Sequence, residues 1–460
     1  MPNRSLFSAT ILLGLFVVLL LVCPGRRHRN KIPWQIRPEA VVTTVGARIP
    51  FVAYQIDPRM AKDGTFRWTL EAGEGPLGSL SDKGVLIAPS QAARFTVVAI
   101  NRKDGTVLRV PVQVMATPVG QSDELAAMPY PLISPMLVAL TDGSVLALGE
   151  DVADHGLLVN PSFAPAQRFD PARNLWRVEG ALQQPRFGHG LLVLRNGGVL
   201  VAGGLDGART PVRQLELMDL QSGQFQGVGT SYYGYQKPAL VVLPSGDLLL
   251  CGADPASDPV PGRGEGGQPV AERLHWQSGN SQFQAVPLVA PPAAYHQGFR
   301  LASGRIFLVG FKASALFDPV HERFSELSLG GASRVLDCGN GHFRLVRGAH
   351  GDMHTRVLEV DPEAGRVLKT WEILAAEGAG PALLGNGHML WLGGSLAGRD
   401  RADALLFDPG SGLRAELPPM RVGRRSPGIV VLVDGSVLAL GGMVNDLEPS
   451  AAGERFRVSF

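Results

Sequence analysis

The sequence is poor in cysteine, in charge and in aromatic residues. Its three cysteines are too few and too scattered for a disulfide framework, and no two of them stand at zinc-ligand spacing. Charged residues make up 18% of the chain, and 43 basic against 41 acidic residues leave a net charge of +2. No nucleic-acid partner is expected from this balance. Stability must therefore come from the burial of apolar side chains.

Glycine and proline are abundant instead. The chain has 57 glycines and 35 prolines, which predicts many turns without reaching the composition of a disordered chain. Hydrophobic residues make up 45% of the 460 residues, as in a packed protein. At about 150 residues per domain, this length predicts more than one domain.

One long apolar run stands at the amino terminus. Residues 6–23 carry no charge, and Pro24 and a basic cluster over residues 26–31 follow them. Such a segment directs a chain to a membrane. Because no small-residue cleavage triplet precedes Pro24, an uncleaved anchor over residues 1–31 is favoured. Cleavage stays open, and so does lipidation at Cys23.

Two signals disagree on the side of the membrane. The basic residues after the apolar run favour a cytoplasmic body under the positive-inside rule. The β domains that follow are of kinds usually exported behind an amino-terminal signal, an analogy that favours the opposite side. The expectation is a membrane-anchored protein that faces the periplasm or the cell exterior.

Residues 32–116 alternate between short apolar strands and turns. Strands are expected at Val41–Thr44, Ile49–Tyr54, Phe66–Leu70, Val85–Ala88, Arg94–Ile100 and Val107–Val114. Their alternation gives each strand one apolar face, as two packed sheets require. The segment resembles bacterial immunoglobulin-like domains in Phe66-Arg67-Trp68, in Gly78-Ser79-Leu80, in Gly84 followed by Ala88-Pro89, and in Thr96-Val97-Val98-Ala99. The resemblance implies a β-sandwich that serves as a spacer or adhesive module, and Trp68 is expected in its core.

Residues 117–460 are dominated by a repeat. Seven tight turns, each between two strongly apolar strands, recur every 37 to 58 residues. They are Asp142-Gly143, Asn196-Gly197, Ser245-Gly246, Ser303-Gly304, Asn340-Gly341, Asn386-Gly387 and Asp434-Gly435. A more polar hairpin follows in six repeats, so a repeat supplies four strands. Continuous apolar runs mark strands covered on both faces, which the stacked sheets of a β-propeller provide.

These repeats resemble the kelch repeats of the galactose oxidase central domain. The matching residues are the double glycines Gly203-Gly204, Gly393-Gly394 and Gly441-Gly442 and the tryptophans Trp176 and Trp371. The resemblance implies an all-β, seven-bladed kelch-type propeller, with six blades as the alternative. The last repeat lacks a fourth strand, and the segment around Ser122 is expected to supply it and close the ring.

Candidate ligand-binding residues gather in the links between blades, because ligand sites lie on variable loops of a rigid scaffold. They are Tyr232, Tyr233, Tyr235, Tyr295, His296, Arg186, His189, Arg424 and Arg425. The tyrosines could stack on a sugar or a partner's apolar side chain, or could pack as wedges between blades. For the arginine-containing links, bonding to backbone carbonyls between blades is favoured over ligand binding.

Metal binding has weaker support in the sequence. Residue types that bind divalent metals occur in one loop at His350, Asp352 and His354, and in another at Asp151, Asp154 and His155. Neither loop fixes a ligand geometry, so an ordinary solvated turn is favoured and no metal or other cofactor is expected.

The resemblance also implies an enzymatic alternative, a copper radical enzyme. Tyr295-His296 is similar to that family's pair of copper ligands. However, the family's cross-linked tyrosine would fall at Phe187, and neither Cys251 nor Cys338 is placed for the cross-link. The sequence therefore predicts a non-catalytic binding protein, membrane-tethered or exported, that presents propeller loops to a glycan or a protein. The alternative is a carbohydrate-active kelch-type enzyme, either a copper oxidase or a sugar-acid epimerase.

Overall fold

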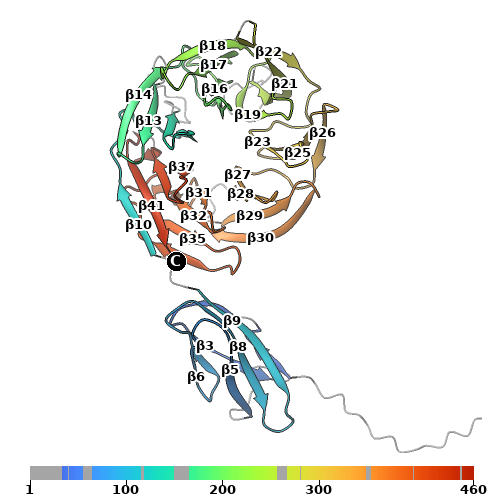
Figure 1. Cartoon of the computed structure of the whole chain (residues 1–460), viewed down its shortest axis with the longest axis vertical. Coiled ribbons are helices and arrows are strands. Elements are labelled where there is room, and N and C mark those ends of the chain that lie inside the picture. The colour runs from blue at the N-terminus through green and yellow to red at the C-terminus, as the bar shows by residue number, and fades with distance from the viewer. Residues whose placement is uncertain are drawn as a thin grey trace, which may run out of the picture. The chain divides into compact units, whose positions relative to one another are not determined.

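The computed structural model describes residues 34–39, 41–54, 65–115, 119–149, 165–255, 267–279, 281–348, 354–396, 398–445 and 448–459. Every regular element in these residues is a β-strand (Figure 1). The chain divides into two compact units, Met1–Met115 and Ala116–Phe460. The apolar run at residues 6–23 lies outside the described residues. Within the described part, no helix has the length and apolar character needed to cross a membrane.

The first unit packs two sheets around one apolar core. One sheet has the order β2 (Val41–Thr44), β9 (Val107–Met115), β8 (Ala93–Asn101), β5 (Phe66–Glu74). The other has the order β3 (Arg48–Pro50), β7 (Val85–Ile87), β6 (Ser79–Leu80), and β1 (Gln35–Arg37) pairs with β4 (Val52–Tyr54). The predicted strands are present, but the one predicted over residues 49–54 is interrupted at Phe51. Trp68 is only partly buried, at the margin of the core.

The second unit consists of four-stranded antiparallel sheets arranged around a ring (Figure 1). Sheet 1 contains β11 (Met136–Ala139), β12 (Val145–Leu148), β13 (Pro165–Asp170) and β14 (Leu175–Ala181). Sheet 2 contains β15 (Gly190–Val193), β16 (Val199–Ala202), β17 (Gln214–Met218) and β18 (Phe225–Thr230). Sheet 3 contains β19 (Gln236–Val242), β20 (Leu248–Asp254), β21 (Gln268–Gln277) and β22 (Gln282–Pro287). One parallel pair, Gly229 with Phe283, joins sheets 2 and 3 into eight strands.

The remaining sheets repeat this order. Sheet 4 contains β23 (Gln297–Arg300), β24 (Ile306–Val309), β25 (Ser314–Asp318) and β26 (Arg323–Leu327). Sheet 5 contains β27 (Arg334–Asp337), β28 (Phe343–Gly348), β29 (His354–Asp361) and β30 (Arg366–Leu374). Sheet 6 contains β31 (Gly380–Leu383), β32 (Met389–Leu392), β35 (Ala404–Phe407) and β36 (Arg414–Leu417), with the hairpin β33 (Ser395–Leu396) and β34 (Arg399–Asp400) between its second and third strands.

The two ends of the second unit meet in sheet 7. This sheet contains β37 (Gly428–Val431), β38 (Val437–Leu440), β41 (Gly453–Ser459) and β10 (Val119–Glu124), and the hairpin β39 (Met443–Val444) and β40 (Glu448–Pro449) stands apart. Ser122 pairs with Phe456 in the ladder, and its hydroxyl donates to Glu454 at 2.9 Å. The predicted pairing of the Ser122 segment with the last strand is confirmed.

The turn between the first and second strands is the same in all seven sheets. Each of the seven predicted turn glycines has a positive φ, between 80° and 93°. This left-handed conformation suits glycine, because a Cβ would clash with the following backbone. The first four residues of each second strand that follows are buried, as Val199–Ala202 and Val437–Leu440 illustrate. The continuous apolar runs are therefore strands covered on both faces.

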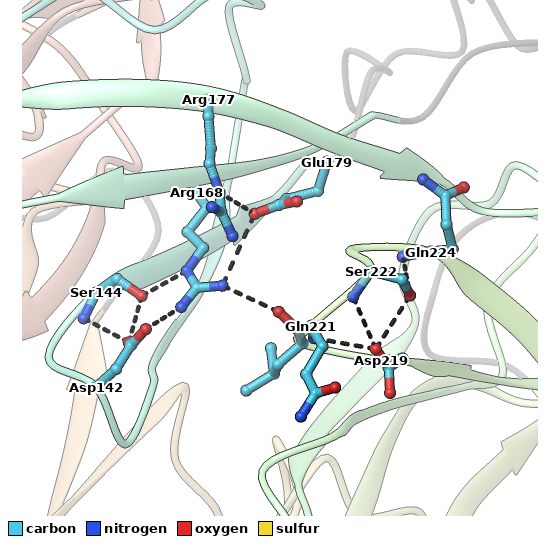
Figure 2. Close-up of polar contacts among 10 residues, drawn as sticks. Asp142, Ser144, Arg168, Arg177, Glu179, Asp219, Gln221, Ser222 and Gln224 are labelled. Carbon is cyan, nitrogen blue, oxygen red and sulfur yellow. Dashed lines mark hydrogen bonds and ion pairs between the residues drawn. The ribbon is translucent and has the colours of Figure 1, made fainter.

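Arginines tie the short turns of neighbouring sheets together. Arg168 on the third strand of sheet 1 pairs with Asp142 and donates to the Ser144 hydroxyl at 2.7 Å, both in its own first turn (Figure 2). The same guanidinium donates to the Leu220 carbonyl of sheet 2 at 3.5 Å. The first turn of one sheet and the last turn of the next therefore lie on the same rim.

Sheet 7 makes the same kind of contact with sheet 1, where the last sheet of the unit meets the first. Arg455 donates to the Ser436 hydroxyl at 2.9 Å in its own first turn and to the Pro171 carbonyl of sheet 1 at 3.4 Å. We call this side of the ring the short-turn rim. In an antiparallel sheet, the connections from the second to the third strand and the links to the next sheet leave from the opposite end. We call that end the loop face.

Candidate functional site

The link between sheets 2 and 3 carries a ladder of three tyrosines on the loop face. Tyr232 is 57% exposed, Tyr233 is half-buried and Tyr235 is completely buried. Their rings meet edge to face, with centroids 4.9 Å apart for Tyr232 and Tyr233 and 6.4 Å apart for Tyr233 and Tyr235. Edge-to-face contacts orient aromatic rings. The buried tyrosine thus supports the exposed one.

A buried carboxylate anchors the backbone of this link. Glu272 on β21 accepts a hydrogen bond from the backbone N–H of Tyr232 at 2.7 Å. Burial raises the pKa of Glu272 to about 7, while the N–H groups of Tyr232 and Tyr233 and the charge of Arg213 oppose that rise. The carboxyl group is therefore part protonated and part ionised at neutral pH.

Three other sheets place a polar side chain at the same register of the third strand. Glu272 lies opposite Leu250, the third residue of the second strand. The residues at the same place in sheets 1, 2 and 7 are Gln167, Glu216 and Glu454, which lie opposite Ala147, Val201 and Ala439. Each of them holds the backbone of the link that enters its own sheet. Glu216 accepts from the N–H groups of Gln183 and Gln184 at 2.6 and 3.1 Å, and Gln167 exchanges two 2.9 Å bonds with the backbone of Tyr130. We call each of these four side chains a clasp, because each holds the backbone of the link that enters its own sheet.

Arg186 and Arg424 complete two of these clasps. Arg186 forms a completely buried ion pair with Glu216, and Arg424 donates to Glu454 at 3.1 Å. Both guanidinium groups also donate to backbone carbonyls of neighbouring segments. Desolvation lowers the pKa of both arginines, and the paired carboxylates oppose this effect. Both arginines therefore bond to backbone carbonyls, which is the structural role that the sequence favours over ligand binding.

Sheet 3 departs from this pattern. Arg186, Tyr235 and Arg424 each stand four residues before the residue that pairs with the fourth residue of the second strand. Tyr235 therefore occupies the place of the arginine. Glu272 consequently lacks the buried cation that Glu216 has. The raised pKa of Glu272 follows from that replacement.

Tyr295 and His296 are consecutive but lie in different surroundings. Tyr295 is buried in the apolar cluster between sheets 3 and 4, and this desolvation raises its pKa. The imidazole of His296 stacks on Phe311, with centroids 4.1 Å apart and ring planes 14° apart. Burial, with smaller contributions from the charges of Lys237 and Arg334, lowers the pKa of His296 to about 4.

The other candidates from the sequence are scattered. His189 is buried, and this burial together with the charge of Arg186 lowers its pKa to about 4. Arg425 pairs with Asp400 at 3.5 Å. His350, Asp352, Asp151, Asp154 and His155 lie outside the described residues, and His354 begins β29. The structure thus brings together the tyrosines of one link and, separately, a basic group around His296.

Lys237 and Arg334 do not stand out in the sequence, yet the structure places both near His296. They belong to β19 and β27, the innermost strands of sheets 3 and 5 (Figure 1). Lys237 has a φ of 50°, a left-handed conformation. The equivalent residue of two other links is Gly188 or Gly378, so aligning the links would have marked Lys237 as unusual.

Comparison with known proteins supports the fold and leaves the activity open. No protein-family model matches the chain, and no curated protein matches its sequence. A solved structure described as a novel fungal alcohol oxidase with catalytic diversity among the AA5 family, in complex with copper, is similar with a TM-score of 0.54 and 13% identity. The match covers 74% of this chain and 76% of that chain. The chain thus has an all-β, galactose oxidase-like fold, consistent with a β-propeller.

The described residues do not fit a copper centre. Copper needs several nitrogen, oxygen or sulfur donors that converge on one point. Tyr295 lies among apolar side chains, His296 lies against Phe311, and burial raises the pKa of the Cys251 thiol. No group of three or more His, Cys, Asp or Glu side chains able to hold a metal occurs in the described ranges.

Proposed function

We propose that this chain is a non-catalytic binding protein, membrane-tethered or exported, whose loop face binds a glycan or a protein. In this proposal residues 1–31 are the anchor, residues 32–116 an immunoglobulin-like spacer, and residues 117–460 a seven-bladed kelch-type propeller with sheets 1–7 as its blades. The body faces the periplasm or the cell exterior.

The difference between the two rims carries the proposal. On the short-turn rim, side chains such as Arg168 and Arg455 are engaged in holding sheet to sheet. On the loop face, Tyr232 exposes its ring on a support of two further tyrosines. An exposed aromatic ring in a fixed orientation offers apolar area at little entropic cost, which suits stacking on a sugar or on an apolar side chain.

A binding screen with matched variants tests this proposal. The detergent-solubilised full chain is applied to a glycan array and to a cell-envelope pull-down. We expect Tyr232→Ala to weaken the detected interaction at least tenfold. Val433→Ala, which changes a fully exposed residue on the short-turn rim, should leave the interaction unchanged. Equal binding by both variants would show that the loop face around Tyr232 is not the site.

The similarity to a copper-containing alcohol oxidase favours a second candidate. This candidate is a carbohydrate-active enzyme of the kelch type, a copper oxidase or a sugar-acid epimerase. The surroundings of Tyr295 and His296 argue against the oxidase, because their side chains do not converge with further donors. Metal analysis after copper loading, together with an alcohol oxidation assay, separates the two functions. Stoichiometric copper with peroxide production would replace the binding proposal.

A further inference from the structure

Three basic side chains gather where the innermost strands of sheets 3, 4 and 5 begin. Lys237 is the second residue of β19, His296 directly precedes β23, and Arg334 is the first residue of β27. These strands run side by side along the inner side of the ring (Figure 1). A first strand starts at the loop face, because it ends in the short-turn rim. All three side chains therefore belong to the loop face.

Hydrogen bonds fix the three strands in this arrangement. The N–H of Ala239 on β19 donates to the carbonyl of Tyr295 at 3.2 Å. Gln297 then holds β27 on both sides of Arg334, because its amide donates to the Ser333 carbonyl at 3.3 Å and accepts from the Val335 N–H at 2.9 Å. The positions of the basic residues are thus set by the sheets and not by a free loop.

Lys237 takes a backbone conformation that costs it free energy. Its N–H donates to the carbonyl of Gly188 at 2.6 Å, and Ser426 donates in the same way to Gly378 at 2.8 Å. All four residues have a φ between 50° and 69°, and two of them are glycine. A left-handed conformation is unfavourable for a lysine. Lys237 therefore occupies this position at a cost in backbone free energy that glycine would avoid.

The two cationic side chains at this place are Lys237 and Arg334. Neither Lys237 nor Arg334 forms an ion pair within the described residues. Arg334 is exposed to solvent at the start of β27. Both charges also lower the pKa of His296, so Lys237 and Arg334 both act at the place where the neutral imidazole lies. Their positive field attracts an anion.

An aromatic ring lies beside this field. One face of Phe311 covers the His296 imidazole, and 46% of the Phe311 side chain is exposed. The backbone of Phe311 approaches Gly331 so closely that a Cβ on Gly331 would lie 2.3 Å from it, so this backbone lies close to the segment that leads into β27. A pyranose that carries a carboxylate has one apolar C–H face and one charged edge, and this pair of features matches it.

We propose that Lys237, Arg334 and Phe311 form a subsite on the loop face for the carboxylate and the ring of an acidic sugar of the hexuronate type. The inference rests on the proposed function and names the ligand class. An acidic peptide fits less well, because its extended chain brings a row of charges and no flat apolar face, whereas the site offers two cations near His296 and the aromatic ring that stacks on that histidine.

The test compares oligosaccharides of equal size, and it compares variants at positions that share the same backbone conformation. Galacturonate oligomers and neutral galactose oligomers are titrated into the full chain by calorimetry. We expect binding of the galacturonate oligomers alone, weakened at least tenfold by Lys237→Gly and by Arg334→Gln. Lys237→Gly places glycine where Gly188 and Gly378 already stand, so its thermal midpoint should equal or exceed that of the wild type. Ser426→Gly is the matched control and should keep full affinity.

Three results would overturn the acidic-sugar subsite. They are no binding of galacturonate oligomers at millimolar concentration, equal binding of the neutral oligomers, and competition by a polyglutamate peptide at equal affinity. A further result separates it from the proposed function. Loss of binding in Tyr232→Ala with full binding in Lys237→Gly would keep the loop face as the binding surface and reject the basic subsite.

Discussion

The substitution Glu272→Gln should stabilise the protein, and more so at alkaline pH. The pKa of Glu272 is about 7 in the folded chain against an ordinary 4.5. Because the folded state holds the proton more tightly, this group costs stability as pH rises from 4.5 through 7. The cost amounts to about 1 kcal/mol at pH 5 and about 3 kcal/mol at pH 8. Glutamine removes it and can still accept the Tyr232 N–H bond, as Gln167 does for Tyr130.

Urea unfolding of the full chain, followed by tryptophan fluorescence at pH 5 and pH 8, measures this effect. We expect the gain from Glu272→Gln in the free energy of unfolding to be larger at pH 8 by about 2 kcal/mol. Glu216→Gln is the matched control, because it leaves the buried Arg186 without its counter-charge. That variant should lose about 3 kcal/mol or more at both pH values. A gain from Glu272→Gln that is equal at both pH values would refute the claim that burial raises the pKa of Glu272.

Three further predictions concern the ring. Arg424→Ala should destabilise the chain by about 3–5 kcal/mol in urea unfolding, because it leaves Glu454 charged and buried, and a smaller loss in Arg424→Ala with Glu454→Gln would confirm the cause. Phe456→Ala should cost about 3–5 kcal/mol, since it opens a cavity in the sheet that joins the two ends of the unit. Tyr232→Ala should change the thermal midpoint by less than about 2 °C, because an exposed side chain carries little stability.

The turns made the order of strands predictable. Each first hairpin depends on a glycine whose positive φ other residues adopt only at a cost, so its place in the sequence marks a bend in the backbone. The missing strand of the last repeat could be assigned for a related reason. A sheet that ends at β41 leaves an unpaired edge, and the segment around Ser122 was the available partner.

The candidate site was less predictable, because burial depends on contacts between links that the sequence does not reveal. Tyr232 and Tyr235 are the same residue type in one link, yet the first is exposed and the second fills the arginine position of a clasp. Lys237 and Arg334 lie 97 residues apart in the numbering, and their proximity depends on the way sheets 3, 4 and 5 follow one another in the ring. No local pattern encodes that neighbourhood.

The four polar clasps show how one chain solves one structural problem in three ways. Sheets 2 and 7 use a carboxylate with a buried arginine, and sheet 1 uses the neutral Gln167, which needs no counter-charge. Sheet 3 keeps the carboxylate Glu272 but replaces the arginine by Tyr235, and it therefore carries an electrostatic cost that the others avoid. Tyr235 is also the buried base of the ladder that presents Tyr232. The clasp that carries an electrostatic cost thus supports the exposed Tyr232, and the proposed function explains this cost as stability exchanged for a binding surface.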